Sequence, residues 1–208
     1  MGFVEKAYDE VFEEESRVRR NPKFEEHRVH AVLYLLEPTA LELKPVDADF
    51  MRRLAVRANV IPVIAKADSL TAIERQRFKN QLNADFARLG ITAHVFPDSA
   101  DSDPAPGLDI RRELQPFSVI GSVEPLPSGA KKGRPYPWGY AECDNPSHCD
   151  LKPLIAALFT LHREELKELT EDNLYERYRT EKLEQATPKK ASSANINEAH
   201  GNAHGINA

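Results

Sequence analysis

The sequence predicts an α/β domain in which a mostly parallel β-sheet lies between two layers of helices. Residues 29–36 and 60–65 are apolar almost throughout, and strands that are apolar on both faces are typical of parallel sheets covered by helices. Between these runs, residues 47–57 place apolar side chains at helical spacing. Strand, helix and strand together form a βαβ unit, whose crossover should be right-handed.

The elements before and after this unit follow from local signals. Residues 4–20 have apolar side chains at helical spacing, and we expect Asn21 and Pro22 to end that helix. After the second strand, Thr71 and Glu74 form a capping box. The helix that they begin should bury one stripe and end at Gly90; the stripe is Ile73, Phe78, Leu82, Phe86 and Leu89.

The second half of the chain is predicted to complete the sheet and cover it. Residues 91–96 and 117–123 are the third and fourth expected strands, separated by an exposed loop at 97–107 that holds three aspartates and three prolines. Residues 124–143 contain glycines and prolines around short β segments, which indicates hairpins.

The C-terminal part is predicted to be helical and then disordered. Residues 151–185 contain no glycine, and their one proline lies in the first turn. Their apolar face should contact the sheet as far as a break near Thr170, where a second helix begins; the face is Leu151, Leu154, Ile155, Leu158, Leu161, Leu166 and Leu169. Residues 186–208 have almost no large apolar side chain, so we expect a disordered tail.

Composition limits the function classes. The 208 residues carry a net charge of −5, which disfavours nucleic acid as a partner because phosphate binding needs a basic face. No apolar run approaches the roughly 20 residues that span a bilayer, and the acidic N-terminus has no secretory signal pattern. Two cysteines are too few for a disulfide framework, which indicates a reducing compartment.

The segment from Cys143 through His148 to Cys149 offers three metal-binding side chains within seven residues. A zinc site usually has four ligands in separated pairs, and no second Cys/His pair lies nearby. We therefore predict a structural loop and no metal.

The end of the second buried strand is where chemistry is expected, because ligands of open α/β sheets bind at the carboxyl ends of the strands. There the sequence reads Lys66-Ala67-Asp68. A lysine stem can lie along a planar base, and a carboxylate two residues later can accept the N1 and N2 hydrogens of guanine. Adenine presents the wrong donor pattern. The alternative is a solvated loop that leads into the capped helix.

The chain resembles the septin family of filament-forming GTP-binding proteins over residues 1–185. Four stretches carry the resemblance: Glu15, Arg20, Glu26 (where the family usually has Asp) and Arg28-Val29-His30 ahead of LYLLEPT; FMRRL followed by NVIPVIAKAD; GRPYPWG followed by HCD; and NLYERYR. The fold that the resemblance implies is a P-loop-NTPase-like, Rossmann-like sheet. Residues 1–185 would be part of a septin-type G domain with a β-rich insertion and long C-terminal helices.

The resemblance also implies roles for single residues. Lys66 and Asp68 would read the guanine of GTP or GDP, with Ala67 between them. Gly121 would let the backbone approach the base, and Arg134 would pack against it. Glu74 and the segment around Trp138 would lie where two septins face each other across their nucleotides. Without the family, Trp138 reads as a core aromatic and Arg134 as a surface charge.

The sequence departs from the family in ways that matter for catalysis. No G-x-x-x-x-G-K-[S/T] phosphate loop and no D-x-x-G switch occur in the 208 residues, so the sequence reads as a domain without its first strand and phosphate-binding part. We expect negligible GTP hydrolysis. Leu41 stands where the family has a histidine that reaches the partner's phosphates. The coiled-coil heptads of many septins are absent.

By resemblance, the chain is expected to act in septin filament assembly and cell division. Its partners would be other septins, through which it could associate peripherally with a membrane. Its expected location is the cytoplasm, at a septum or bud-neck-like cortex. The alternatives are a nucleotide-independent assembly module and a truncated gene product without function.

Overall fold

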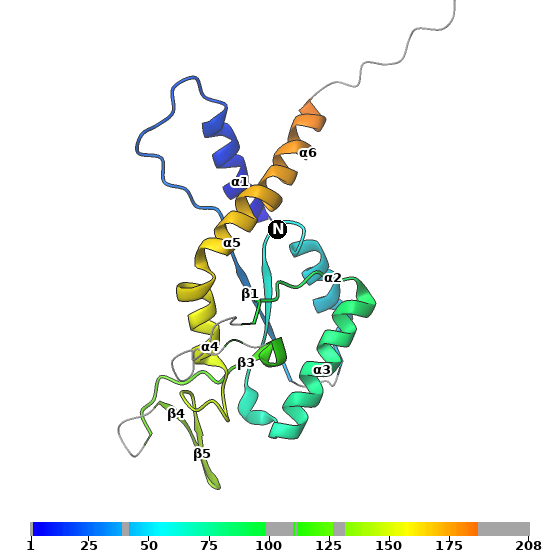
Figure 1. Ribbon diagram of the computed structural model, residues 1–208, viewed down its shortest axis with the longest axis vertical. Coiled ribbons are helices and arrows are strands. Elements are labelled where there is room, and N and C mark those ends of the chain that lie inside the picture. The colour runs from blue at the N-terminus through cyan, green and yellow to red at the C-terminus, as the bar shows by residue number, and fades with distance from the viewer. Residues whose placement is uncertain (1, 39–41, 99–109, 111, 127–131, 187–208) are drawn as a thin grey trace, which may run out of the picture.

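A computed structural model describes residues 2–38, 42–98, 110, 112–126 and 132–186. A β-sheet lies between two layers of helices, and a separate hairpin lies at one end of the molecule (Figure 1). The predicted α/β fold is therefore confirmed. Most of the expected loop at 97–107, residues 187–208 of the expected tail and the segment Thr39 to Leu41 lie outside the described residues. Ala186, which was expected to begin the disordered tail, is the last residue of a helix.

The sheet consists of β1 (Val32–Leu36), β2 (Val60–Ile64) and β3 (Phe117–Ser118), in that order and all parallel. The βαβ prediction is confirmed, although the fourth expected strand is only two residues long. The prediction of a strand at 91–96 is wrong, because these residues form no strand. The Gln115 side chain bonds both main-chain groups of Phe96, each at 2.9 Å, so a side chain replaces the neighbouring strand.

The two central strands differ in burial. Every residue of β2 is buried, as the sequence predicts. The prediction that β1 is buried on both faces is wrong, because Leu33 and Leu35 are 44% and 62% exposed. The remaining residues of β1 contact the core on the opposite face.

One helical layer consists of α2 (Pro45–Leu54) and α3 (Ala72–Leu89). These helices pack Met51, Phe78 and Leu82 against one face of the sheet. The capping box of Thr71 and Glu74 is confirmed, and α3 ends at Gly90 in the left-handed conformation. Ile73 is not part of the buried stripe: it is 83% exposed, because the second position of α3 lies on the side away from the sheet.

The other layer is one long helical run. It consists of α4 (Leu151–Ala156), a π-helical turn η3 (Ala157–Leu161), α5 (Arg163–Leu169), a second π-helical turn η4 (Thr170–Tyr175) and α6 (Glu176–Ala186). Leu154 and Leu166 pack against Ile61 and Val63 on the second face of the sheet. Ile155 and Leu161, predicted on that apolar face, are about half exposed.

The predicted break near Thr170 is wrong. The backbone at Thr170 stays helical, at φ −68° and ψ −43°, and the Thr170 hydroxyl donates to the Leu166 carbonyl at 2.8 Å. Thr170 is itself buried. The helix therefore widens into a π-turn without breaking.

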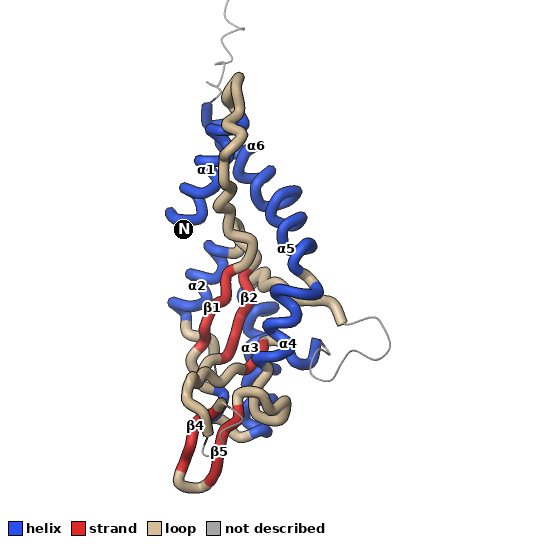
Figure 2. Tube along the Cα trace, turned by 90° about the vertical axis from the view of Figure 1, so that its left-hand side faces the viewer, coloured by secondary structure: helices blue, strands red, loops and turns tan. Residues whose placement is uncertain are grey.

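The first helix, α1 (Gly2–Glu15), crosses α6 at the end of the molecule opposite the hairpin (Figures 1 and 2). Tyr8 of α1, Tyr175 of η4 and Tyr178 of α6 form the tyrosine cluster, in which the Tyr8 ring centroid lies 5.6 Å from that of Tyr175 and 5.3 Å from that of Tyr178. The helix ends five residues earlier than residue 20, because the Glu14 carboxylate accepts the Asn21 N–H and turns the chain back.

The expected hairpin in the region 124–143 is confirmed as β4 (Gly133–Tyr136) paired with β5 (Gly139–Glu142). Gly133 is required there, because a Cβ at this position would lie 2.5 Å from the Ala141 carbonyl oxygen. Two short 3₁₀ turns, η1 (Ala67–Ser69) and η2 (Arg112–Leu114), complete the elements. Within the described ranges, no helix is both long and apolar enough to cross a membrane.

Candidate functional site

The Lys66–Asp68 segment follows β2 directly, at the carboxyl end of the sheet. The Ala67 N–H donates to the Val119 carbonyl at 3.1 Å, and the Val119 N–H donates to the Ile64 carbonyl at 2.8 Å. These two bonds extend the β2–β3 pairing past the ends of both strands. The segment that leads to Gly121 therefore lies beside the Lys66–Asp68 segment.

Asp68 is the centre of the site, and its side chain is only 2% exposed. Its Oδ2 accepts hydrogen bonds from the guanidinium of Arg134 at 2.9 Å and from the hydroxyl of Tyr136. Its Oδ1 is buried and has no partner among the described residues. A buried carboxylate oxygen without a donor is costly to leave unsatisfied, so Asp68 retains capacity to accept a further hydrogen bond.

The hairpin supplies the two donors that reach Asp68. Arg134 and Tyr136 are both in β4, two residues apart, and the guanidinium of Arg134 lies 6.0 Å from the centroid of the Tyr136 ring. The nearby Asp68 carboxylate raises the pKa of the Tyr136 hydroxyl. The structure therefore brings Arg134 and Asp68 together across 66 residues.

Lys66 lies at the rim of the site. It is left-handed at φ 50°, a conformation that non-glycine residues adopt rarely and that functional sites often hold. Its ammonium is 3.4 Å from the Glu37 carboxylate, just past the end of β1. The Lys66 and Lys44 ammonium groups lower the pKa of Glu37. The lysine side chain is 64% exposed and thus accessible at the ends of the strands.

Gly121 lies in the exposed segment after β3, and Glu74 lies in the first turn of α3. A Cβ at Gly121 would meet nothing within 4 Å, so its exposed backbone faces open space. Glu74 Oε2 accepts from the Thr71 N–H at 2.9 Å and from the Thr71 hydroxyl at 2.8 Å. Its local task is to cap α3, and these hydrogen bonds lower its pKa.

A hollow of about 210 Å³ adjoins Asp68. Ala72 and Arg75 of α3 line one side of it, and Ile120 and Tyr140 line another. The guanidinium of Arg75 donates to the carbonyls of Ser147 and His148, each at 2.7 Å. The loop after β5 is thereby fixed against α3.

A buried ion pair between Lys79 and Asp150, which the sequence analysis did not predict, lies next to the site. The Lys79 ammonium donates to Asp150 Oδ2 at 2.6 Å and to the Leu114 carbonyl at 2.7 Å, and both side chains are more than nine-tenths buried. The same oxygen of Asp150 accepts from the N–H and hydroxyl of Ser118 in β3. This buried ion pair joins α3, β3 and the start of α4. Nothing in the sequence pattern of α3 distinguishes Lys79 from Arg77 and Arg88 of the same helix, which are exposed.

Cys143 and Cys149 are buried free thiols that pack with Ala67 and Ile120. The Ile120 N–H donates to the Cys149 sulfur at 3.1 Å, and burial raises the pKa of both thiols. The His148 Nδ1 accepts the Glu142 N–H at 3.2 Å. In the part of the chain that the structure describes, no group of three or more His, Cys, Asp or Glu side chains is arranged to hold a metal ion.

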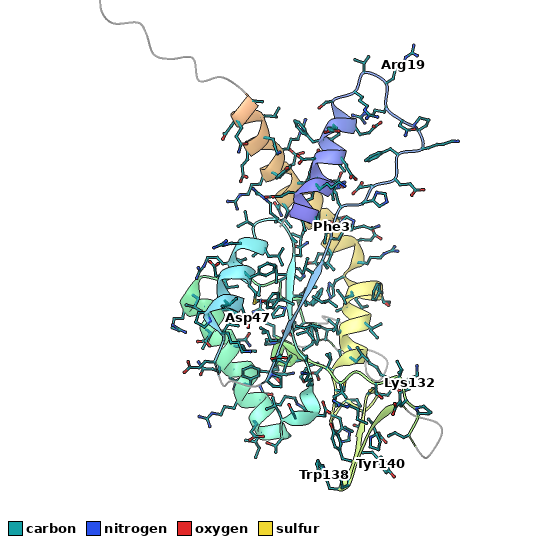
Figure 3. All side chains as sticks on the ribbon, turned by 180° about the vertical axis from the view of Figure 1, so that it is seen from behind. Phe3, Arg19, Asp47, Lys132, Trp138 and Tyr140 are labelled. Carbon is teal, nitrogen blue, oxygen red and sulfur yellow. The ribbon has the colours of Figure 1, made fainter. Side chains whose placement is uncertain are left out.

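Trp138 lies at the tip of the hairpin, where it is 83% exposed. Its ring stacks on Tyr136, with centroids 5.1 Å apart and planes 11° from parallel. Figure 3 shows Trp138 and Tyr140 at one extremity of the molecule, far from Phe3. The alternative interpretation of Trp138 as a core aromatic is therefore wrong.

Comparison with known proteins identifies the family. A family model described as Septin matches residues 1–192. The chain belongs to the septin family. It is 44% identical over 186 residues to Septin homolog spn3 of Schizosaccharomyces pombe, an alignment that covers 87% of this chain and 50% of spn3.

Two further matches concern one yeast septin. Cell division control protein 11 of Saccharomyces cerevisiae is 41% identical over 189 residues, covering 87% of this chain and 45% of that protein. The crystal structure of Cdc11 from the same yeast matches with a TM-score of 0.56 and 31% identity, over 87% of this chain and 73% of the crystallised chain. This septin thus spans about half the length of the relatives it matches.

Proposed function

We propose that the carboxyl ends of β2 and β3 form the guanine-reading part of a GTP- or GDP-binding site. The observation that carries the proposal is the buried, unpartnered Oδ1 of Asp68. The N1 and N2 hydrogens of guanine are two adjacent donors, and a carboxylate accepts both. Adenine has an acceptor at N1, so the same carboxylate disfavours it.

The neighbouring residues fit such a ligand. Lys66 is exposed at the rim with a stem long enough to lie over a base, and Gly121 leaves open space beside its backbone. Arg134 and Tyr136 hold Oδ2 of Asp68. For both oxygens to accept from one base, these two donors must release Oδ2, which frees the guanidinium of Arg134 to pack against the base. Ala67 contributes the backbone between the two reading residues.

The test compares the affinities of the chain for GDP and ADP by calorimetry. GDP should bind more tightly, and Asp68→Asn should weaken GDP binding by at least about tenfold, since a charge-assisted hydrogen bond is worth roughly 1.5–3 kcal/mol. Asp49→Asn is the matched control, because Asp49 lies on α2 and pairs with Arg53 at the surface. Equal affinities for GDP and ADP would exclude guanine reading.

We further propose that the 208-residue chain does not hydrolyse GTP. Catalysis of phosphoryl transfer depends on groups that position and neutralise the phosphates, and the sequence holds neither motif that supplies them. Phosphate release from GTP should equal a protein-free blank, with or without Mg²⁺. Turnover that one substitution within residues 60–140 abolishes would contradict this proposal.

The second candidate function is nucleotide-independent assembly with other septins in filaments that act in cell division. The exposed Trp138, stacked on Tyr136, favours it. Exposed aromatic residues are frequent anchors of interfaces. The hairpin that carries Trp138 is held against the sheet by the hydrogen bonds of Arg134 and Tyr136 to Asp68.

Co-purification with spn3 tests assembly. Trp138→Ala should weaken the complex by about 2 kcal/mol or more, roughly 30-fold in Kd. Phe3→Ala is the matched control, because Phe3 is 75% exposed and lies far from the hairpin. Equal pull-down by both variants, with aggregates on size exclusion and no cooperative melting, would show that the chain does not have this function.

A further inference from the structure

A row of side chains connects Asp68 with the tip of the hairpin. Arg134 and Tyr136 are two residues apart in β4 and therefore lie on the same face of the strand. The guanidinium of Arg134 is 6.0 Å from the centroid of the Tyr136 ring, and the Trp138 ring stacks on Tyr136 with centroids 5.1 Å apart. A movement of the Tyr136 ring at Asp68 is thus also felt at Trp138.

The two oxygens of the Asp68 carboxylate are occupied unequally. Oδ2 accepts from both the Arg134 guanidinium and the Tyr136 hydroxyl, whereas Oδ1 is buried and has no partner among the described residues. A carboxylate oxygen has about two lone pairs for hydrogen bonds, so two donors fill Oδ2. The N1 and N2 hydrogens of one guanine need both oxygens, and the hairpin holds one of them.

The two hairpin donors differ in what they gain when a base displaces them. The guanidinium of Arg134 exchanges the carboxylate for the face of the base, and its side chain is 46% exposed, which leaves it room to turn. The Tyr136 hydroxyl has no such compensation, because the ring that carries it already stacks on Trp138. Of the two donors, Tyr136 is therefore the one that opposes the binding of guanine.

We propose that the Tyr136 hydroxyl is a built-in competitor of guanine for Asp68, and that a bound base displaces it and shifts the Tyr136–Trp138 stack. This inference rests on the proposed guanine site. It makes Tyr136 a residue that sets the affinity of that site, although the base itself need not touch it. Trp138 is 83% exposed, so the shift changes the surface that the hairpin tip presents to solvent.

Calorimetry on Tyr136→Phe tests the competition, because phenylalanine keeps the ring and its stack but has no hydroxyl. The variant should bind GDP and guanosine about tenfold more tightly than the parent, since a hydrogen bond to a charged acceptor no longer has to be broken. Its affinity for ADP should not rise. A merely structural role of Tyr136 cannot give this result, because damage to the site weakens binding.

The matched control is Tyr34→Phe. It also removes a hydroxyl that donates to a carboxylate, in this case that of Asp47 at 2.7 Å, but it lies on β1 and α2, away from Asp68. Its affinities for GDP, guanosine and ADP should equal those of the parent.

Tryptophan fluorescence of the unmodified chain tests the shift of the stack and needs no variant. Trp138 is the single tryptophan of the 208 residues, so its emission reports on the hairpin tip alone. Saturating GDP should change this emission, and the same concentration of ADP should not.

The outcomes separate the competition from the guanine site itself. Equal or weaker GDP binding by Tyr136→Phe overturns the competition, while guanine reading by Asp68 stands if the parent still prefers GDP to ADP. An emission of Trp138 that does not respond to saturating GDP likewise overturns the proposal. If neither the parent nor Tyr136→Phe binds GDP or guanosine, the proposed guanine site and the competition are both refuted.

Discussion

Lys79→Met should cost about 3 kcal/mol of folding free energy, because it leaves the buried Asp150 carboxylate without its cation. Removing one partner of a buried ion pair typically costs about 3–5 kcal/mol. Asp150 keeps two hydrogen bonds from Ser118, at 2.9 and 2.6 Å, which places the expected cost at the lower end. That loss is a large fraction of the roughly 5–15 kcal/mol by which domains are stable.

Urea unfolding followed by far-UV circular dichroism measures this cost. The matched control is Lys152→Met: Lys152 is half exposed and lies 3.9 Å from Asp144, so its loss should cost less than about 1 kcal/mol. In an Asp150→Asn background, Lys79→Met should cost at least about 1 kcal/mol less than it does in the parent, because no buried anion remains.

Two results would refute the reasoning. One is a cost for Lys79→Met no greater than that of Lys152→Met. The other is strict additivity of Lys79→Met and Asp150→Asn, which would show that the two charges do not interact. Burial lowers the pKa of Lys79 despite the neighbouring Asp150, so desolvation is the larger effect at this ammonium.

Two further predictions concern α3 and the segment beside β2. Thr71→Ala should lower stability by about 1 kcal/mol through loss of the capping box, whereas Thr71→Ser should cost much less; equal melting temperatures for both variants would contradict this. Burial lowers the pKa of His94, whose Nε2 is buried without a partner in the described residues. The unfolded state therefore binds more protons below its pKa of about 6.5, and stability should fall as the pH drops through and below that value, by at most about 1.4 kcal/mol per pH unit for this residue. His94→Phe should flatten the dependence of Tm on pH, and an unchanged slope would show that His94 does not contribute.

Sequence periodicity predicted the elements that depend on local pattern. The uniformly apolar run of β2, the capping box of α3 and the Gly/Pro-rich hairpin each carry a signal within a few residues, and each is confirmed. The local sequence pattern was misleading where the burial of a strand depends on whether another element covers it. Residues 29–36 read as a strand buried on both faces, but Leu33 and Leu35 are exposed because no described helix covers them.

Some residues of the candidate site could be predicted from local sequence, and others could not. The position of Asp68 after a buried strand predicts a ligand-binding residue, and the resemblance to the family predicts that Arg134 lies near it, where the structure places it. The buried pair of Lys79 and Asp150, 71 residues apart, could not be predicted, since a lysine on an amphipathic helix is usually solvated. The prediction of a strand at 91–96 was wrong because the main-chain N–H and carbonyl of Phe96 bond the Gln115 side chain and not a neighbouring strand.

The tyrosine cluster has a consequence for biosynthesis. Tyr175 and Tyr178 donate to Glu15 and Asp9, each at 2.6 Å, across sequence separations of 160 and 169 residues. A ribosome releases α1 long before these tyrosines are translated, so Val4, Tyr8 and Val11 emerge with their packing partners still unmade. Contacts of such long range form late and slow folding. Through that interval, the apolar side of α1 stays exposed on the nascent chain, which favours aggregation.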